Sequence, residues 1–204
     1  MSMPVLTYGC TRCDLKAWDA MTWGYRFYQV KKEQYRMAVS MGWCHVCSSL
    51  VPVERRPQAG MERSLQAEQA SLQAHVRLLR QQQPGARWWL FRRPASRELL
   101  QAELKLESVS NDLLRLRRLL SLMKDRQSGD RCLACGSEAC FHLPAPSFQA
   151  SFDEIHEHPQ RLDCLHPGCG GQLTVSCDGT RLNVAGRARA YDLRGMPLGD
   201  WQAF

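Results

Sequence analysis

Two segments in the middle of the chain show the hydrophobic spacing of α-helices. Residues 61–83 and 96–124 are rich in helix-forming residues and contain neither proline nor glycine. In the second segment apolar residues repeat every seven positions on one seam, at Leu99, Leu106, Leu113 and Leu120 and at Ala102, Val109, Leu116 and Met123. The first segment has a weaker stripe, formed by Leu65, Leu72, Val76 and Leu79. Because only residues 84–95 connect the two segments, the pattern predicts a long antiparallel α-helical hairpin with coiled-coil-like packing.

Four further leucines of the second segment lie outside this seam. Leu100, Leu104, Leu114 and Leu122 widen its apolar face. Apolar surface of this kind needs cover from another part of the chain or from another molecule. The hairpin is therefore also a candidate surface for homo-oligomerisation.

Short runs typical of β-strands lie on both sides of the helical segments. Residues 23–30 alternate and are rich in aromatics, and residues 34–39 follow closely enough to pair back against them. Residues 172–176, 181–185 and 188–193 are separated by glycine-containing turns and predict a small antiparallel meander. The predicted fold class is α+β, with two small zinc-stabilised antiparallel β modules, at residues 1–56 and 129–204, joined by a helical hairpin at residues 57–128.

Cysteine pairs at the spacing of metal knuckles mark both β modules. Cys10 and Cys13 are followed, after thirty intervening residues, by Cys44 and Cys47. Cys132 and Cys135 are followed at the same spacing by His166 and Cys169. A Cys-x-x-Cys turn presents two corners of a tetrahedron, and two such turns complete a Zn²⁺ site. The spacing predicts two structural zinc ions, each held by two knuckles that are neighbours in the sequence.

The fourth ligand of the second site has two candidates. His166-Pro-Gly-Cys169-Gly170 has the form of a knuckle, because the trailing glycine can adopt φ > 0 and turn its amide toward the thiolate. Cys164 is the alternative, at a longer spacing from Cys169. Cys140 and Cys177 have no cysteine partner two residues away.

The first module resembles a zinc ribbon, a fold in which a β-hairpin lies between two Cys-x-x-Cys knuckles. The resemblance covers about forty residues and rests on Cys10, Cys13, Cys44 and Cys47. Zinc ribbons commonly bind nucleic acid or dock onto larger assemblies, so the resemblance implies one of these roles without separating them.

The sequence gives less support to disulfide bonds, to a redox role for the cysteines or to an enzymatic function. The first fifteen residues lack the pattern of a secretory leader, and no run of eighteen apolar residues exists, so we expect a cytoplasmic protein with no membrane partner and reduced thiols. Four protein ligands per zinc leave no open position for catalysis. Familiar catalytic motifs are absent, and a Ser-His-Asp set requires arbitrary choice among scattered residues, so we predict no catalytic residue and no enzyme.

The charge is uneven along the chain. Its formal net charge is +7, and residues 61–128 carry 13 Lys and Arg against 7 Asp and Glu, whereas residues 129–204 carry 6 against 9. Arginines and aromatics gather around the hairpin tip, at Arg77, Arg80, Arg87, Trp88, Trp89, Phe91, Arg92, Arg93 and Arg97. Arginine forks bind phosphate and tryptophan stacks on bases, but the same aromatics could cap the open end of the hairpin.

The first module combines basic residues with a second aromatic group, formed by Trp18, Trp23, Tyr25, Phe27, Tyr28, Tyr35 and Trp43. Such a set can form a platform for single-stranded nucleic acid or fill the core of a small domain. The favoured hypothesis is a non-enzymatic zinc-binding adaptor that contacts nucleic acid or a nucleoprotein complex through the first module and the hairpin tip. The alternative is an assembly protein with an oligomerising hairpin and purely structural zinc.

Overall fold

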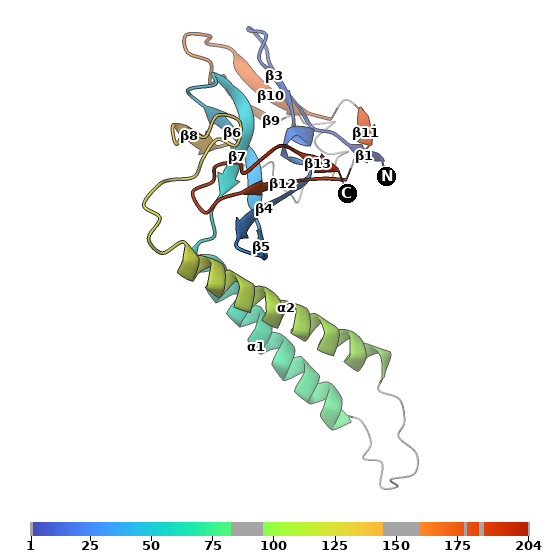
Figure 1. The fold of residues 1–204 in the computed structure, drawn as a ribbon. Helices are drawn as coiled ribbons and strands as arrows, with labels where there is room; N and C mark the ends of the chain where they lie inside the picture. The colour runs from blue at the N-terminus through green and yellow to red at the C-terminus, as the bar shows by residue number, and fades with distance from the viewer. Residues whose placement is uncertain (1, 83–95, 145–159, 178, 184–185, 204) are drawn as a thin grey trace. The chain divides into compact units, whose positions relative to one another are not determined.

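The computed structural model describes residues 2–82, 96–144, 160–177, 179–183 and 186–203 (Figure 1). The chain divides into two compact units, one formed by Met1–Arg56 with Arg126–Phe204 and the other by Pro57–Asp125. We call them the β unit and the helix unit. The predicted separation of residues 1–56 from residues 129–204 is therefore wrong, because both segments belong to one β unit into which the helix unit is inserted.

Short strands dominate the β unit on both sides of the insertion. Before it lie β1 (Ser2–Pro4), β2 (Thr7–Cys10), β3 (Lys16–Trp18), the 3-10 turn η1 (Asp19–Thr22), β4 (Tyr25–Val30), β5 (Glu33–Arg36), β6 (Ala38–Cys44) and β7 (Ser49–Arg55). After it lie β8 (Cys140–His142), β9 (Gln160–Asp163), β10 (Gln172–Ser176), β11 (Arg181–Asn183), β12 (Arg187–Tyr191) and β13 (Gln202–Ala203).

Every sheet of the β unit combines strands from both sides of the insertion. The strand orders are β3-β2-β10-β9, β13-β12-β4-β5, β7-β6-β8 and β1-β11. β4 and β5 pair antiparallel, as the pattern of residues 23–39 predicts. The predicted C-terminal meander is wrong, because β10, β11 and β12 each pair with an N-terminal strand instead of with one another.

Apolar residues from both halves of the chain fill a common core. Tyr8, Trp43 and Leu50 pack with Leu173 and Val175, and all five are buried. On β10 these residues alternate with more exposed ones, as expected for a strand with one face toward the core. Burial of apolar surface from residues far apart in sequence therefore holds the two halves of the β unit together.

A buried polar network lies close in sequence to the start and end of the insertion. Glu54 is fully buried and accepts hydrogen bonds from both terminal nitrogens of Arg126, at 2.6 Å each. Its carboxylate also accepts a bond from the Tyr28 hydroxyl at 2.5 Å, and Arg126 donates to the carbonyl of Leu193. The two buried charges compensate each other, whereas either charge buried without its partner would destabilise the fold.

The helix unit consists of α1 (Ala59–Gln82) and α2 (Arg97–Leu122). The Ser96 side chain caps α2 by accepting a hydrogen bond from the Leu99 amide at 3.2 Å. The helices run antiparallel, since Arg117 near the end of α2 pairs with Glu62 near the start of α1, and Arg80 pairs with Glu103. The residues that would complete a hairpin, 83–95, lie outside the described residues.

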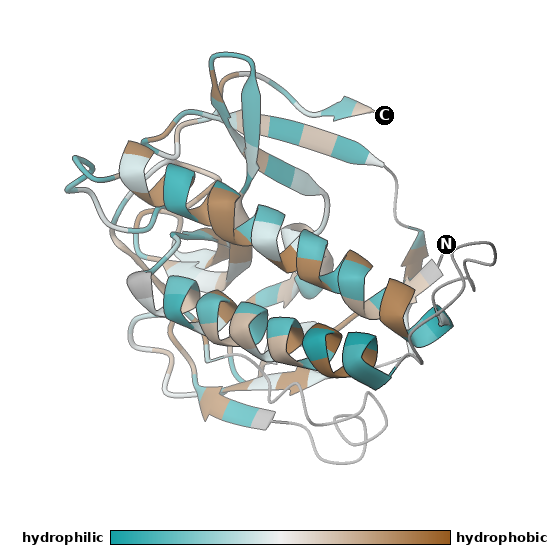
Figure 2. Cartoon of the chain, turned by 90° about the horizontal axis from the view of Figure 1, so that it is seen from below, coloured by the Kyte–Doolittle hydropathy of each residue, from teal (hydrophilic) through white to brown (hydrophobic). Residues whose placement is uncertain are grey.

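The interface of the two helices uses the seam that the heptad pattern predicts. Val76 packs with Leu99 and Ala102, and Leu79 and Leu106 lie against them. Hydrophobic and hydrophilic residues alternate along both helices in Figure 2. Leu100, Leu104 and Leu114, outside the seam, are 51 %, 57 % and 68 % exposed. In the described part of the chain, neither helix is long and apolar enough to cross a bilayer.

Candidate metal centres

Eight cysteines form two groups that can each hold a metal ion. The first tetrad is Cys10, Cys13, Cys164 and Cys169, and the second is Cys44, Cys47, Cys132 and Cys135. Within each tetrad the four sulfur atoms lie within 4.8 Å of one another. The predicted number of sites and all predicted cysteines are present in this arrangement, and Cys164 takes the place of His166.

The pairing of the knuckles differs from the prediction. We expected Cys10 and Cys13 to share a site with Cys44 and Cys47, but the first knuckle faces the last and the second faces the third. The cause is strand pairing, because β2 lies beside β10 and β6 lies beside β8. The zinc-ribbon order, with a hairpin between two knuckles of one site, therefore does not describe residues 10–47.

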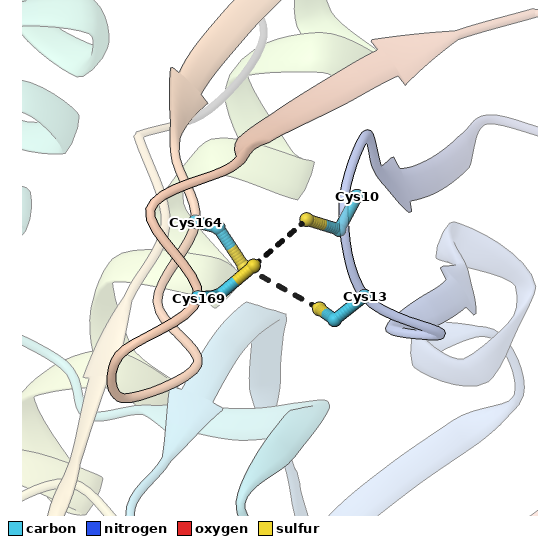
Figure 3. A group of neighbouring side chains, drawn as sticks. All are labelled: Cys10, Cys13, Cys164 and Cys169. Atoms are coloured by element: carbon cyan, nitrogen blue, oxygen red, sulfur yellow. Dashed lines mark hydrogen bonds between the residues drawn. The ribbon is translucent and has the colours of Figure 1, made fainter.

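The first tetrad is built from two turns at one end of a four-stranded sheet. Cys10 ends β2 and Cys13 lies in the connection from β2 to β3, whereas Cys164 and Cys169 lie in the connection from β9 to β10. Figure 3 shows the four sulfurs directed toward one another from these two turns. The sulfur of Cys10 lies 3.5 Å from that of Cys169, and the sulfur of Cys13 lies 3.8 Å from that of Cys164.

The end of β9 explains why Cys164 is a ligand and His166 is not. Cys164 is the first residue after β9, and its amide donates to the carbonyl of Gly171 at 2.9 Å, which holds it beside β10. His166 lies farther out in the turn, is exposed, and has its ring 6.5 Å from that of Trp43. The knuckle spacing correctly identified Cys169, but it could not show how far β9 extends.

Glycines allow the backbone to approach the first tetrad closely. Gly170 has φ +59°, a conformation that favours glycine. A Cβ atom on Gly171 would lie 2.9 Å from the sulfur of Cys10 and 3.2 Å from that of Cys169. The Arg12 amide donates to the sulfur of Cys10 at 3.3 Å, and its guanidinium donates to the Cys169 carbonyl. These contacts leave room for the sulfurs and for an ion, but not for a side chain at residue 171.

Two cysteines of the second tetrad are more deeply buried than any of the first, whereas Cys135 is exposed. Cys44 ends β6, Cys47 follows in the turn to β7, and Cys132 pairs through an isolated bridge with Val53. Cys44 and Cys132 are fully buried and pack with Val51 and Val53. The sulfur distances are 3.6 Å from Cys44 to Cys135 and 3.8 Å from Cys47 to Cys132. Cys140 packs nearby, but its thiol is directed to the carbonyls of Asp130 and Ser137.

Both tetrads fit a tetrahedral thiophilic ion. Zinc–sulfur bonds of about 2.3 Å place tetrahedral thiolates about 3.8 Å apart, close to the observed separations. The amides of Cys13 and Arg12 donate to Cys10 and lower the pKa of its thiol to about 6. Burial raises the pKa of Cys132 to about 11 and that of Cys164 to about 12. A bound cation would stabilise all of these thiolates and release their protons.

The structure also brings together a serine, a histidine and an aspartate that the sequence did not single out. Ser40 Oγ lies 2.6 Å from His142 Nδ1, and His142 Nε2 lies 2.7 Å from an Asp130 oxygen. In the hydrolase triad the two ring nitrogens have the opposite partners. Burial alone would raise the pKa of Asp130, but hydrogen bonds from His142 and Arg56 hold it below its ordinary value. This chain of contacts joins β6, β8 and the segment before Cys132.

Most aromatics of the first module serve the core. Phe27, Tyr28, Tyr35 and Trp43 are buried, whereas Trp18 and Tyr25 are 43 % and 37 % exposed. The ammonium group of Lys16 lies 5.6 Å from the centre of the exposed Trp18 ring. The predicted aromatic platform is thus reduced to a few exposed rings.

The predicted partner-binding residues are only partly described. Arg77, Arg80 and Arg97 are exposed on the helices, and Arg80 donates to Glu103. The remaining tip residues, Arg87, Trp88, Trp89, Phe91, Arg92 and Arg93, lie outside the described residues. Their predicted role in partner binding stays a prediction.

Comparison with known proteins gives no relative. No protein-family model matches the chain, and no curated protein and no solved structure matches it.

Proposed function

We propose that this chain is a non-enzymatic nucleic-acid-binding adaptor whose β unit is held together by two structural zinc ions. The observation that carries the proposal is the composition of the tetrads. Each combines a knuckle that precedes the inserted helix unit with one that follows it. An ion in either site therefore joins the two halves of the β unit, and four thiolates leave it no open coordination position.

Zinc is the metal that best suits this donor set. Four cysteine sulfurs in tetrahedral geometry select Zn²⁺ or iron, and a purely structural site has no need of a redox metal. Iron in such a site colours a protein, whereas zinc is colourless. Elemental analysis of the purified chain should give two zinc ions per chain, and a content of one or none contradicts the proposal.

Nucleic acid is the partner class favoured by charge. The chain carries a formal net charge of +7, and its exposed aromatics include Trp18 beside Lys16. Lysine and arginine contacts to phosphate make affinity fall with salt, and exposed rings add stacking on bases. The same combination at Arg87, Trp88, Trp89, Arg92 and Arg93 supports a contribution from the segment between α1 and α2.

Fluorescence anisotropy with labelled single-stranded oligonucleotides, measured over a series of salt concentrations, tests this role. The zinc-loaded chain should bind, with a steep decrease of affinity as salt rises. Substituting Arg87, Arg92 and Arg93 by Ala should flatten that salt dependence by about one unit of slope per lost phosphate contact. Absence of binding at low salt to single strands and duplexes alike would reject the nucleic-acid role.

A second candidate function follows from the outer face of α2. Leu100, Leu104 and Leu114 are large, apolar and more than half exposed. An assembly protein would cover them with a second copy or with another protein. Sedimentation of the wild type and of a Leu104→Glu, Leu114→Glu variant separates the two candidates. The assembly role is favoured if the wild type is a dimer, the double variant is a monomer, and the chain does not bind nucleic acid.

A further inference from the structure

Three arginines meet on one face of the β unit, and none of them has an acidic partner among the residues that the structure describes. Arg26 of β4 and Arg189 of β12 are direct partners in the parallel register of these strands, and Arg187 lies two residues before Arg189 on the same face. Like charges placed opposite each other in a sheet repel. Among the described residues, the ion pairs of the β unit use Arg56, Arg126 and Arg131 instead.

Trp201 brings two of these guanidinium groups together. It directly precedes β13, which pairs with β12 at Arg187 and Ala188 (Figure 1). The guanidinium carbon of Arg26 lies 4.7 Å from the centre of the indole ring, and that of Arg187 lies 4.9 Å from it. Arginine is held well by such stacking, because the electron-rich ring face attracts the cation and leaves its N–H groups free to donate within their plane.

The three arginines line a cavity of about 280 Å³. Its other described lining residues are Met21, Pro52, Leu133, Ala134, Tyr191 and Trp201, and none of those described is acidic. Arg189 is partly fixed by a hydrogen bond from its Nε to the Gly199 carbonyl at 2.9 Å. The cavity is thus lined by cationic and apolar groups, with two of its cations positioned by ring stacking and one by the backbone.

Arg26 is a buried cation with an unsatisfied hydrogen-bond donor. The residue is only 5 % exposed, and its terminal nitrogens donate to the carbonyls of Met21, Thr22 and Trp23. Its Nε is buried and has no hydrogen-bond partner in the described part of the chain. Burial lowers the pKa of Arg26, the neighbouring Tyr191 opposes this, and the charges of Arg187 and Arg189 lower it further. A buried cation with an unused donor and, among the described residues, no acidic partner is costly, and an anion would satisfy both its charge and its donor.

We propose that the cavity between β4, β12 and Trp201 is a binding site for a phosphate group. Guanidinium forks match the spacing of phosphate oxygens, and several of them compensate a doubly charged anion better than a single one does. The phosphate can belong to a small phosphorylated molecule or to a nucleic-acid strand. The second source rests on the proposed nucleic-acid role, whereas the pocket itself does not.

Calorimetric titration of the zinc-loaded full-length chain with pyrophosphate tests the pocket. Arg187→Gln and Arg189→Gln should each weaken binding by roughly tenfold, since each removes one charge-assisted contact. Arg194→Gln is the matched control, because it removes the same charge from an exposed position that does not line the cavity and should leave the affinity unchanged. Thermal unfolding should confirm that all three variants fold, and pyrophosphate should stabilise only the wild type and the control by a large margin.

The outcomes distinguish the two proposals. Absence of pyrophosphate binding, or equal losses in Arg187→Gln, Arg189→Gln and Arg194→Gln, overturns the pocket. A short 5′-phosphorylated single strand that competes with pyrophosphate in the wild type identifies nucleic acid as the source. Pyrophosphate binding that depends on Arg187 and Arg189, without any oligonucleotide binding, keeps the pocket and rejects the nucleic-acid role. Oligonucleotide binding that all three variants retain, in a chain that does not bind pyrophosphate, rejects the pocket and keeps the nucleic-acid role.

Discussion

The two cysteine tetrads have the same four donors but lie in different surroundings. All four cysteines of the first are partly exposed and join two turns at the end of a sheet. In the second, Cys44 and Cys132 are fully buried and pack against Val51 and Val53, although Cys135 is exposed. A metal site can thus either link strands that already pair or form part of the hydrophobic core itself. Loss of metal should therefore have unequal consequences.

The largest expected difference is between Cys132→Ser and Cys10→Ser. Cys132→Ser should release the second metal and unfold the β unit, because a structural site contributes its binding energy to folding and this one also fills the core. Cys10→Ser should release one zinc and leave the β unit folded, with lower stability. Elemental analysis and urea unfolding measure both effects, and Cys140→Ser, which retains both tetrads, is the control. Equal losses of stability would show that the burial of the second tetrad is unimportant.

The buried ion pair between Glu54 and Arg126 joins the two halves of the β unit without a metal, so it can be compared with the metal sites. Arg126→Met leaves the Glu54 carboxylate buried without its cation and should cost about 3–5 kcal/mol in the free energy of unfolding. Arg131→Met removes the more exposed pair with Glu138 and should cost under about 1 kcal/mol. Both variants should keep two zinc ions. If Arg126→Met unfolds no earlier than Arg131→Met, the metals alone hold the two halves together.

A smaller effect is expected from glycine substitution at the first tetrad. Gly171→Ala places a methyl group within contact of two ligand sulfurs and the Arg12 side chain, and overpacking of this kind costs about 1–3 kcal/mol. This destabilisation of the first tetrad should appear as faster removal of its zinc by a chelator, whereas the zinc of the second tetrad should be unaffected. Gly9→Ala on β2 is the matched control, since its added Cβ would have no atom within 4 Å. Identical zinc release from both variants would contradict the geometry of the site.

The smallest expected effect concerns His166. His166→Ala should retain both zinc ions and change the free energy of unfolding by less than about 0.5 kcal/mol, because the side chain is exposed and is not a ligand. Cys164→Ser should release the first zinc. This is the reverse of what the knuckle spacing predicts. Zinc loss from His166→Ala with retention in Cys164→Ser would restore the ligand set expected from the sequence.

Local chemistry made several features of this protein predictable from sequence. The heptad of residues 99–123 identifies the buried seam of α2, since side chains seven residues apart lie on the same face of a helix. Each Cys-x-x-Cys turn identifies two ligands, because two residues suffice to place both sulfurs on one ion. Residues 172–176 match β10 because their alternation follows the pleat of a half-buried strand.

The tertiary structure decided what these local elements contact. Four knuckles can be joined in pairs in three ways, and their spacing does not choose among them. The choice was made by hydrogen bonds between β2 and β10 and between β6 and β8, across an insertion that the sequence presented as a linker between modules. The arginine cavity has the same origin, because Arg26 and Arg189 become neighbours only when β4 and β12 pair. Sequence patterns report what each segment forms by itself, whereas strand pairing depends on the surface that distant segments bury together.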